Sequence, residues 1–252
     1  MIRGETHGAV TVLTLEHGKA NALDTELCRG LAAALDELVR EGVPAVVLTG
    51  RGSIFSAGVD LFRVVDGGAA YVADFLPALS ELFLALVELP RPLVAAVNGH
   101  AIAGGCLVAC ACDRRLMVAG RGRIGVPELR VGVPFPTLAL EILRTTAGTA
   151  GARELATRGH TVGPEEAEQL GLVDRVTPAE TLLDEACAEA ERLAALPADA
   201  FALTKRQLWT PALDAYHRHG AGRDAEVVEQ WSREASRQAI RRYLAETVGR
   251  KG

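Results

Sequence analysis

Two glycine-containing segments carry the residues best suited to chemistry in this chain of 252 residues. They lie at 51–61 (RGSIFSAGVDL) and 97–106 (VNGHAIAGGC), and each follows an apolar run. Gly58 stands beside small residues, so a ligand could approach the main chain and its N–H groups closely. Gly104 stands at the predicted start of a helix, where N–H groups lack partners and favour negative charge. Either segment alone is also explained as a tight turn, and neither has the pattern of a dinucleotide or phosphate loop.

The elements that position these two segments alternate between strands and helices. Residues 10–15 alternate β-branched and polar side chains, whereas 45–50 and 93–99 are short apolar runs typical of strands covered on both faces. A helix is predicted from the N-cap Asp24 to Gly42, and an amphipathic segment follows at 69–89. Further elements are predicted at 104–112 (a short helix) and 115–119 (a strand). This alternation indicates an α/β domain, in which ligands gather at strand ends.

The last part of the chain has a different character. No strand pattern follows Pro178, and the remaining segments are amphipathic. They lie at 178–196, 198–208 and 223–246, with predicted breaks at Pro197, Pro211 and 220–222. The sequence therefore predicts a helical C-terminal appendage that begins near residue 185.

Composition and charge exclude several classes of partner. The chain has 32 Asp and Glu against 27 Lys and Arg, a net charge of −5 without a basic block, so nucleic acid is not an expected partner. No apolar run reaches the ~18 residues of a membrane span, and the N-terminus lacks a signal-peptide pattern. We therefore expect a cytoplasmic protein without a membrane partner. The odd number of cysteines, in no common zinc spacing, predicts buried thiols and no metal: Cys28, Cys106, Cys110, Cys112 and Cys187.

In their order and distance, the two glycine segments resemble the signature of the crotonase (enoyl-CoA hydratase/isomerase) superfamily. That signature is F-x-A-G-x-D-[LI], followed by A-x-N-G-x-x-x-G-G-G/C and a cysteine–aspartate step. The matching positions here are 55–61, 97–99, 103–106 and 112–113. The likeness extends to 21–23, 159–167 and 171–173, so it covers nearly the whole chain.

The resemblance implies an α/β fold with two parts. Residues 1–185 would form a crotonase-like spiral of ββα units, and residues 186–252 a helical C-terminal trimerisation region. The implied assembly is a homotrimer or a dimer of trimers. The implied substrate is an acyl-CoA thioester of fatty acid metabolism, with coenzyme A as part of the substrate and no separate cofactor.

The resemblance also implies how a thioester would be held. Removing a proton beside a thioester places negative charge on its carbonyl oxygen, and each preorganised donor there contributes ~3–4 kcal/mol. The implied donors are the N–H groups of Ala57 and Gly104. The implied CoA and acyl contacts are Lys19, Ala20, Asn21, Leu23, Ser56, Ala57, Gly58, Asp60, Leu61, Gly104, Gly105 and Leu107. Apolar residues after Leu61 indicate an acyl pocket: Phe62, Val64, Val65, Tyr71 and Phe75.

Two positions separate the possible reactions. The resemblance implies that hydratases of the family hold a water molecule between two glutamates. The residues at these two positions here are Leu107 and Glu128. A leucine side chain cannot deprotonate water, so two-carboxylate hydration loses its base. A single carboxylate can still move a proton between two carbons, as the conversion of 3-enoyl-CoA to 2-enoyl-CoA requires. Dienoyl-CoA isomerases have a second acid where this chain has Pro136. The pattern favours a Δ3,Δ2-enoyl-CoA isomerase with Glu128 as its acid and base.

Alternatives remain open at this point. Glu128 could be a structural carboxylate and Leu107 an ordinary core residue. The chain could be an enoyl-CoA hydratase that recruits another acid, for instance Glu81 or Glu141. It could also be a catalytically poor acyl-CoA-binding subunit, which would bind CoA esters without exchanging their α-protons.

Overall fold

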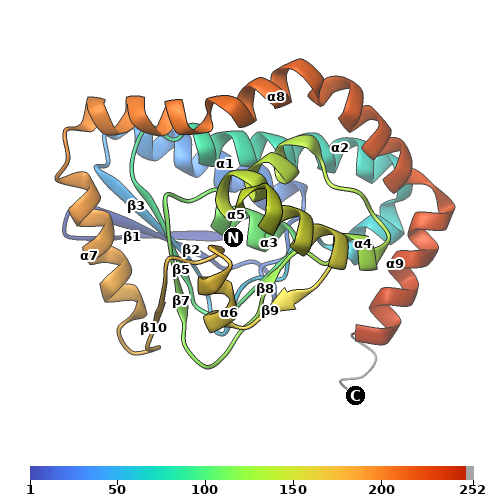
Figure 1. The fold of residues 1–252 in the computed structure, drawn as a ribbon, viewed down its shortest axis with the longest axis horizontal. Coiled ribbons are helices and arrows are strands. Elements are labelled where there is room, and N and C mark those ends of the chain that lie inside the picture. The colour runs from blue at the N-terminus through green and yellow to red at the C-terminus, as the bar shows by residue number, and fades with distance from the viewer. Residues whose placement is uncertain (248–252) are drawn as a thin grey trace.

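A six-stranded sheet forms the centre of the computed structural model, which describes residues 1–247 (Figure 1). Its strand order is β1-β2-β3-β5-β7-β10. The strands are β1 (Ile2–His7), β2 (Val10–Leu15), β3 (Ala45–Gly50), β5 (Leu93–Val97), β7 (Arg114–Val118) and β10 (Arg175–Thr177). β1 and β2 are antiparallel, and all other neighbours are parallel. The apolar runs at 45–50 and 93–99 are thus confirmed as interior strands.

A second, four-stranded sheet of short strands lies beside the first. Its order is β4 (Ile54–Ser56), β6 (His100–Ile102), β8 (Ile124–Gly125) and β9 (Thr161–Val162). β4, β6 and β8 each follow a strand of the large sheet and precede a helix. The chain therefore repeats a strand–strand–helix unit, which confirms the predicted ββα spiral.

Nine helices of the described residues pack around these sheets. They are α1 (Thr25–Arg40), α2 (Leu61–Glu88), α3 (Gly104–Cys110), α4 (Glu128–Val131), α5 (Thr137–Arg158), α6 (Pro164–Gln169), α7 (Leu182–Ala194), α8 (Ala198–Ser232) and α9 (Glu234–Thr247). Asp24 caps α1 as predicted, because its carboxylate accepts the Leu27 N–H at 2.8 Å. The helical C-terminal region is also confirmed, since no strand follows β10 in residues 1–247.

Two helices differ from their predicted limits. α2 begins at Leu61 rather than at 69, because the Asp60 carboxylate accepts the N–H groups of the first turn; Gly68, at φ +57°, then interrupts the helix. α8 continues through Pro211 and 220–222, where breaks were predicted. Proline removes one helical hydrogen bond, but buried side chains such as Trp209 pack α8 against α2 and α5. Tertiary packing thus outweighs the local breakers.

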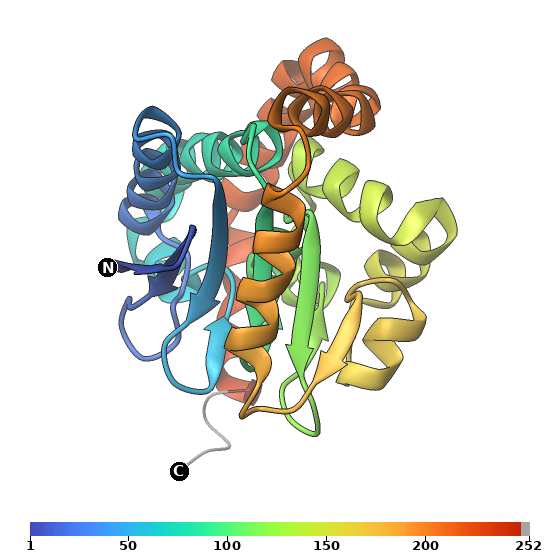
Figure 2. The same cartoon turned by 90° about the vertical axis from the view of Figure 1, so that its left-hand side faces the viewer.

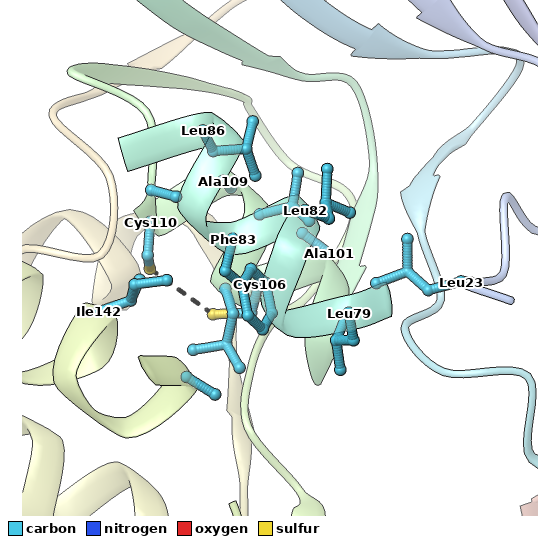
Figure 3. Close-up of a cluster of buried hydrophobic side chains, with 14 of the residues drawn as sticks. Leu23, Leu79, Leu82, Phe83, Leu86, Ala101, Cys106, Ala109, Cys110 and Ile142 are labelled. Atoms are coloured by element: carbon cyan, nitrogen blue, oxygen red, sulfur yellow. Dashed lines mark hydrogen bonds between the residues drawn. The ribbon is translucent and has the colours of Figure 1, made fainter. Parts of the chain in front are cut away.

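Apolar clusters cover both faces of the large sheet. The larger one lies between the sheet and helices α1, α2, α3, α5 and α8, and Figure 3 shows its centre. Cys106 and Cys110 belong to it, with their sulfurs 3.9 Å apart (Figure 3). All five cysteines are free and four are buried, as predicted for packing thiols. α2 is long and apolar enough to cross a membrane, but 56% of its most apolar stretch is buried inside the fold, as in a core helix.

The smaller cluster packs α7 onto the opposite face of the sheet (Figure 2). Its α7 members are Leu182, Ala186, Ala190 and Leu193. The predicted division between 185 and 186 therefore falls inside a helix that belongs to the core. The remaining helices, α8 and α9, pack on α2, α4 and α5 (Figure 1). The end of the predicted trimerisation region, 248–252, lies outside the described residues.

Candidate active site

The turn after β4 directs one backbone donor into a pocket. Gly58 has φ +80°, and a Cβ there would lie 2.4 Å from the Ile102 oxygen, so only glycine fits. Its carbonyl accepts the Leu23 N–H at 2.8 Å. The N–H of a trans peptide points opposite to its carbonyl. The Val59 N–H therefore points away from Leu23, and none of the described residues accepts it.

The start of α3 supplies a second donor beside the first. Ala103 has φ +53°, an uncommon conformation outside glycine, and its carbonyl accepts the Leu107 N–H at 3.1 Å. The Gly104 N–H, in the same peptide, therefore points out of the helix and has no acceptor in the described chain. A Cβ on Gly58 would lie 3.1 Å from the Gly104 nitrogen, so the two turns are in contact. Val59 and Gly104 both line the same pocket.

Two sequence-based assignments need correction. The Ala57 N–H, predicted as an oxyanion donor, donates to the Ala20 carbonyl at 2.9 Å and is therefore occupied. Ala57 lines the pocket, but the N–H of this turn that has no acceptor among the described residues is that of Val59. Gly105 does not line the pocket; a Cβ there would lie 2.4 Å from the Ser56 carbonyl oxygen, so its role is close packing against β4.

Glu128 is a buried carboxylate facing the same pocket. It is the first residue of α4 and only 7% exposed. Burial raises its pKa from 4.5 to about 8, opposed only by a hydrogen bond to its own backbone N–H. Its Oε2 is buried, and no described residue bonds to it. A carboxylate with a pKa near neutrality and an unpaired oxygen is suited to accepting and returning a proton.

The rest of the pocket is almost entirely apolar. Leu107 lines it one turn after Gly104 and is 2% exposed. Glu128 is the one carboxylate among the lining residues of the described chain. The pocket holds about 550 Å³ of empty space, including its open mouth. The other lining residues are Val59, Leu61, Leu79, Ile102, Ala103, Pro127, Val131, Val133, Pro136, Ala139, Trp231 and Tyr243.

The other predicted contact residues surround the pocket without lining it. Ser56 Oγ donates to the Asn21 carbonyl at 2.7 Å, and Asn21 Nδ2 donates to the Ile54 and Phe55 carbonyls, so the two predicted CoA segments are joined. Asp60 caps α2. Lys19 is exposed beside this junction. Those outside the lining are Lys19, Ala20, Asn21, Leu23, Ser56, Gly58, Asp60 and Gly105.

The apolar residues predicted to form an acyl pocket after Leu61 lie outside this pocket. None of the predicted residues from Phe62 to Phe75 lines the pocket; Phe62 is 55% exposed and Phe75 belongs to the core. Leu79, Trp231 and Tyr243 form the wall instead. Val59 lies inside the segment that resembles the family signature, whereas tertiary packing alone brings Trp231 and Tyr243 here.

The two acids proposed for an alternative base lie elsewhere. Glu81 is exposed on α2, and Glu141 pairs with Arg144 at 2.6 Å; neither lines the pocket. Tyr243 is the other titratable group among the described lining residues, and burial together with the Glu128 charge raises its pKa. The site thus combines two free N–H donors with one carboxylate.

A ββα spiral with these elements defines a crotonase-fold protein whose pocket suits a reaction passing through an oxyanion. The family model for enoyl-CoA hydratase/isomerase matches residues 5–248, and the chain belongs to this family. It is 36% identical to a putative enoyl-CoA hydratase of Thermus thermophilus, over 97% of both chains. It is 31% identical to human mitochondrial enoyl-CoA delta isomerase 1, over 100% of this chain and 84% of that one.

The similar solved structures also include both isomerases and hydratases. Human mitochondrial delta3-delta2-enoyl-CoA isomerase superposes with a TM-score of 0.93 at 31% identity, covering 100% of this chain and 99% of that one. An enoyl-CoA hydratase, EchA3, from Mycobacterium ulcerans superposes with a TM-score of 0.83 at 30% identity, covering 89% and 98%. The comparisons therefore establish an enoyl-CoA hydratase/isomerase family member and leave the reaction to the residues of the site.

Proposed function

We propose that the protein is an enoyl-CoA isomerase that converts 3-enoyl-CoA to 2-enoyl-CoA. The observation that carries this proposal is the single carboxylate, Glu128, in a pocket whose other walls are apolar. The position of a second glutamate in family hydratases is occupied by Leu107. A double-bond shift needs one group that accepts and returns a proton, whereas two-carboxylate hydration needs a second group to hold water.

In the proposed mechanism, the thioester carbonyl oxygen accepts hydrogen bonds from the Val59 and Gly104 N–H groups. The Glu128 carboxylate removes a proton from C2 of the 3-enoyl chain, and the electrons spread over the carbonyl oxygen and C4. The two N–H groups stabilise this dienolate, each by about 3 kcal/mol. Glu128 then returns the proton to C4, which leaves the double bond between C2 and C3. No atom is gained or lost, and the apolar wall at Leu107 gives water no partner.

We propose that the coenzyme A portion lies along the junction of residues 19–23 and 56–61. This junction borders the pocket at Ala57 and Leu61. Lys19 is exposed there and carries the charge expected of a phosphate contact. We also propose a trimer or a dimer of trimers. Part of the apolar surface assigned to assembly is covered within the chain, but Leu203 and Leu208 are 47% and 68% exposed on α8.

One assay separates the proposed reaction from its alternatives. Purified protein is incubated separately with 3-enoyl-CoA and 2-enoyl-CoA, and the products are identified. An isomerase forms 2-enoyl-CoA from the first and little 3-hydroxyacyl-CoA from the second. Rapid hydration of 2-enoyl-CoA would make the protein a hydratase. Binding without turnover, and without exchange of α-protons in deuterated water, would make it an acyl-CoA-binding subunit.

A further inference from the structure

Side chains from two long helices form one wall of the pocket. Leu79 of α2 and Trp231 of α8 line it and are 3% and 2% exposed. Pro136, just before α5, completes this wall. α2 and α8 run in contact along the molecule (Figure 1), so the wall is built between them.

A second cavity lies directly behind this wall. Pro136 lines both spaces. On α2 the second cavity is lined by Leu76 and Ser80, the residues three before and one after Leu79. On α8 it is lined by Val227 and Val228, one turn before Trp231. It holds about 920 Å³ of empty space, part of it open to solvent. A single layer of side chains therefore separates the two spaces.

Hydrogen bonds hold this layer in place. The Trp231 indole N–H donates to the Pro134 carbonyl at 2.9 Å, which fixes the ring against the loop before α5. The Asp224 carboxylate accepts the Thr137 N–H at 2.8 Å and the Thr137 hydroxyl at 2.7 Å, which fixes the start of α5 to α8. These bonds hold Trp231 and the start of α5 in place, so an acyl chain that reached this wall would have no apolar space left to fill.

We propose that Leu79 and Trp231 set the acyl-chain length by separating the acyl pocket from the second cavity. The preferred substrates then have chains that end at the wall. Removing either side chain joins the two spaces and admits longer chains. This inference rests on the proposed function for the identity of the substrate, and it concerns only the length of the chain.

The test measures kcat/KM for 3-enoyl-CoA substrates of six, eight, ten, twelve and sixteen carbons. For the wild type, kcat/KM rises by up to about fourfold per buried methylene until the wall is reached, and then falls. In Trp231→Ala and Leu79→Ala, the decrease in kcat/KM begins at longer chains than in the wild type. Trp231→Phe keeps most of the ring and stays close to the wild-type limit. The two alanine variants change residues on different helices, so the proposal can still be tested if one of them fails to fold.

Two further variants exclude a general loosening of the protein. Trp209→Ala removes the same side chain from the same helix, in the core but outside both spaces, and leaves the chain-length limit unchanged. Ala225 is an exposed residue of the second cavity. Ala225→Trp, added to Trp231→Ala, refills the cavity and returns the limit toward the wild-type value.

The proposal is overturned if folded Trp231→Ala and Leu79→Ala both keep the wild-type limit, or if the wild type processes sixteen-carbon chains as well as eight-carbon chains. Binding of saturated acyl-CoA thioesters, ranked by length, gives the same comparison without turnover. If the protein hydrates 2-enoyl-CoA instead, the series is measured with that substrate. Failure of the proposed reaction is therefore distinguishable from failure of the wall.

Discussion

Lys205 Nζ lies 2.8 Å from Asp113 Oδ2, which joins α8 to the turn between α3 and β7. The Lys205 side chain is 4% exposed, and the Asp113 side chain is 15% exposed. The same Asp113 oxygen accepts the Leu93 N–H at 2.8 Å, at the start of β5. One carboxylate thus connects the helical C-terminal region to two central strands.

Removing the lysine charge alone should destabilise the fold strongly. Lys205→Met keeps the apolar stem but leaves the Asp113 carboxylate without its cation, which should lower the free energy of unfolding by about 3–5 kcal/mol. Urea denaturation measures this loss. The double variant Lys205→Met/Asp113→Asn should lose less than the sum of the single variants, because no unpaired charge remains. Strict additivity would contradict a direct interaction.

Replacing the proposed acid/base group should abolish turnover while the fold persists. Glu128→Gln keeps the shape of the side chain but cannot carry a proton, so kcat should fall by at least ~10²-fold. For the wild type, kcat/KM should rise with pH and level off above about 8, because the free enzyme reacts through the ionised carboxylate. Wild-type activity in the variant would refute the assignment of Glu128.

The same variant should change how stability depends on pH. The Glu128 pKa is about 8 in the folded chain, against an ordinary value of 4.5. Below 4.5 both states are protonated; between 4.5 and 8 only the unfolded state loses the proton, so wild-type stability falls as pH rises and levels off above 8. Relative to the wild type, Glu128→Gln should therefore gain a few kcal/mol between pH ~5 and ~9. Urea denaturation of both proteins at the two pH values measures this difference. If the free energies of unfolding of the wild type and the variant changed equally with pH, the raised pKa of Glu128 would be contradicted.

The adjacent glycines of α3 should respond differently to alanine. A Cβ on Gly105 would meet the Ser56 carbonyl at 2.4 Å, and the backbone there cannot easily move, so Gly105→Ala should cost about 3 kcal/mol or more. A Cβ on Gly104 would meet the flexible end of Leu23 at 2.8 Å, so Gly104→Ala should cost under about 1.5 kcal/mol. Its kcat/KM should nevertheless fall at least ~10-fold, since Gly104 positions a proposed donor. Equal stability losses would contradict this contrast.

The proposed trimer should depend on the exposed leucines of α8. Leu203→Glu/Leu208→Glu places two charges on this surface and should convert the assembly to monomers. Light scattering after size-exclusion chromatography measures the mass. Arg40→Glu, on the exposed end of α1, serves as the charge-changing control and should leave the mass of the assembly unchanged. If the wild-type protein were itself a monomer, the proposed trimer would be refuted.

Much of the fold could be predicted from local patterns in the sequence. The apolar runs at 45–50 and 93–99, the Asp24 cap and the two glycine turns depend on neighbouring residues, so they could be predicted. The identity of the first donor could not. Whether Ala57 or Val59 points its N–H into the pocket depends on the positive φ of Gly58, which only the folded turn reveals.

The proposed acyl wall could not be predicted from the sequence for another reason. Trp231 and Tyr243 lie more than one hundred positions after Glu128, and neither belongs to a recognisable motif. Trp231 reaches the pocket on α8, which runs uninterrupted past Pro211, where the sequence predicts a break, and Tyr243 reaches it on α9. The pocket was predicted after Leu61 because apolar residues follow that position, but apolar character alone does not show which residues face a cavity.

Leu107 gives the sharpest test of the reaction, because one side chain separates the two leading functions. It is 2% exposed and lines the pocket that contains Glu128. As an isomerase, the wild type should convert 3-enoyl-CoA readily and add water to 2-enoyl-CoA only weakly, because the leucine holds no water. Leu107→Glu should raise hydration above this baseline, and Leu107→Gln, equal in size but without a base, serves as its matched control.

The gain from Leu107→Glu should be small, for a reason already visible at Glu128. Burial raises the pKa of a carboxyl group, and a second carboxylate nearby raises it further, so the new acid would be largely protonated and a weak base. Its hydration rate should therefore increase with pH more steeply than that of Leu107→Gln. The decisive measurement is the ratio of isomerisation to hydration in the unmutated protein. If this ratio were below one, the protein would be a hydratase and the proposed isomerase function would be wrong, whatever the activities of the variants.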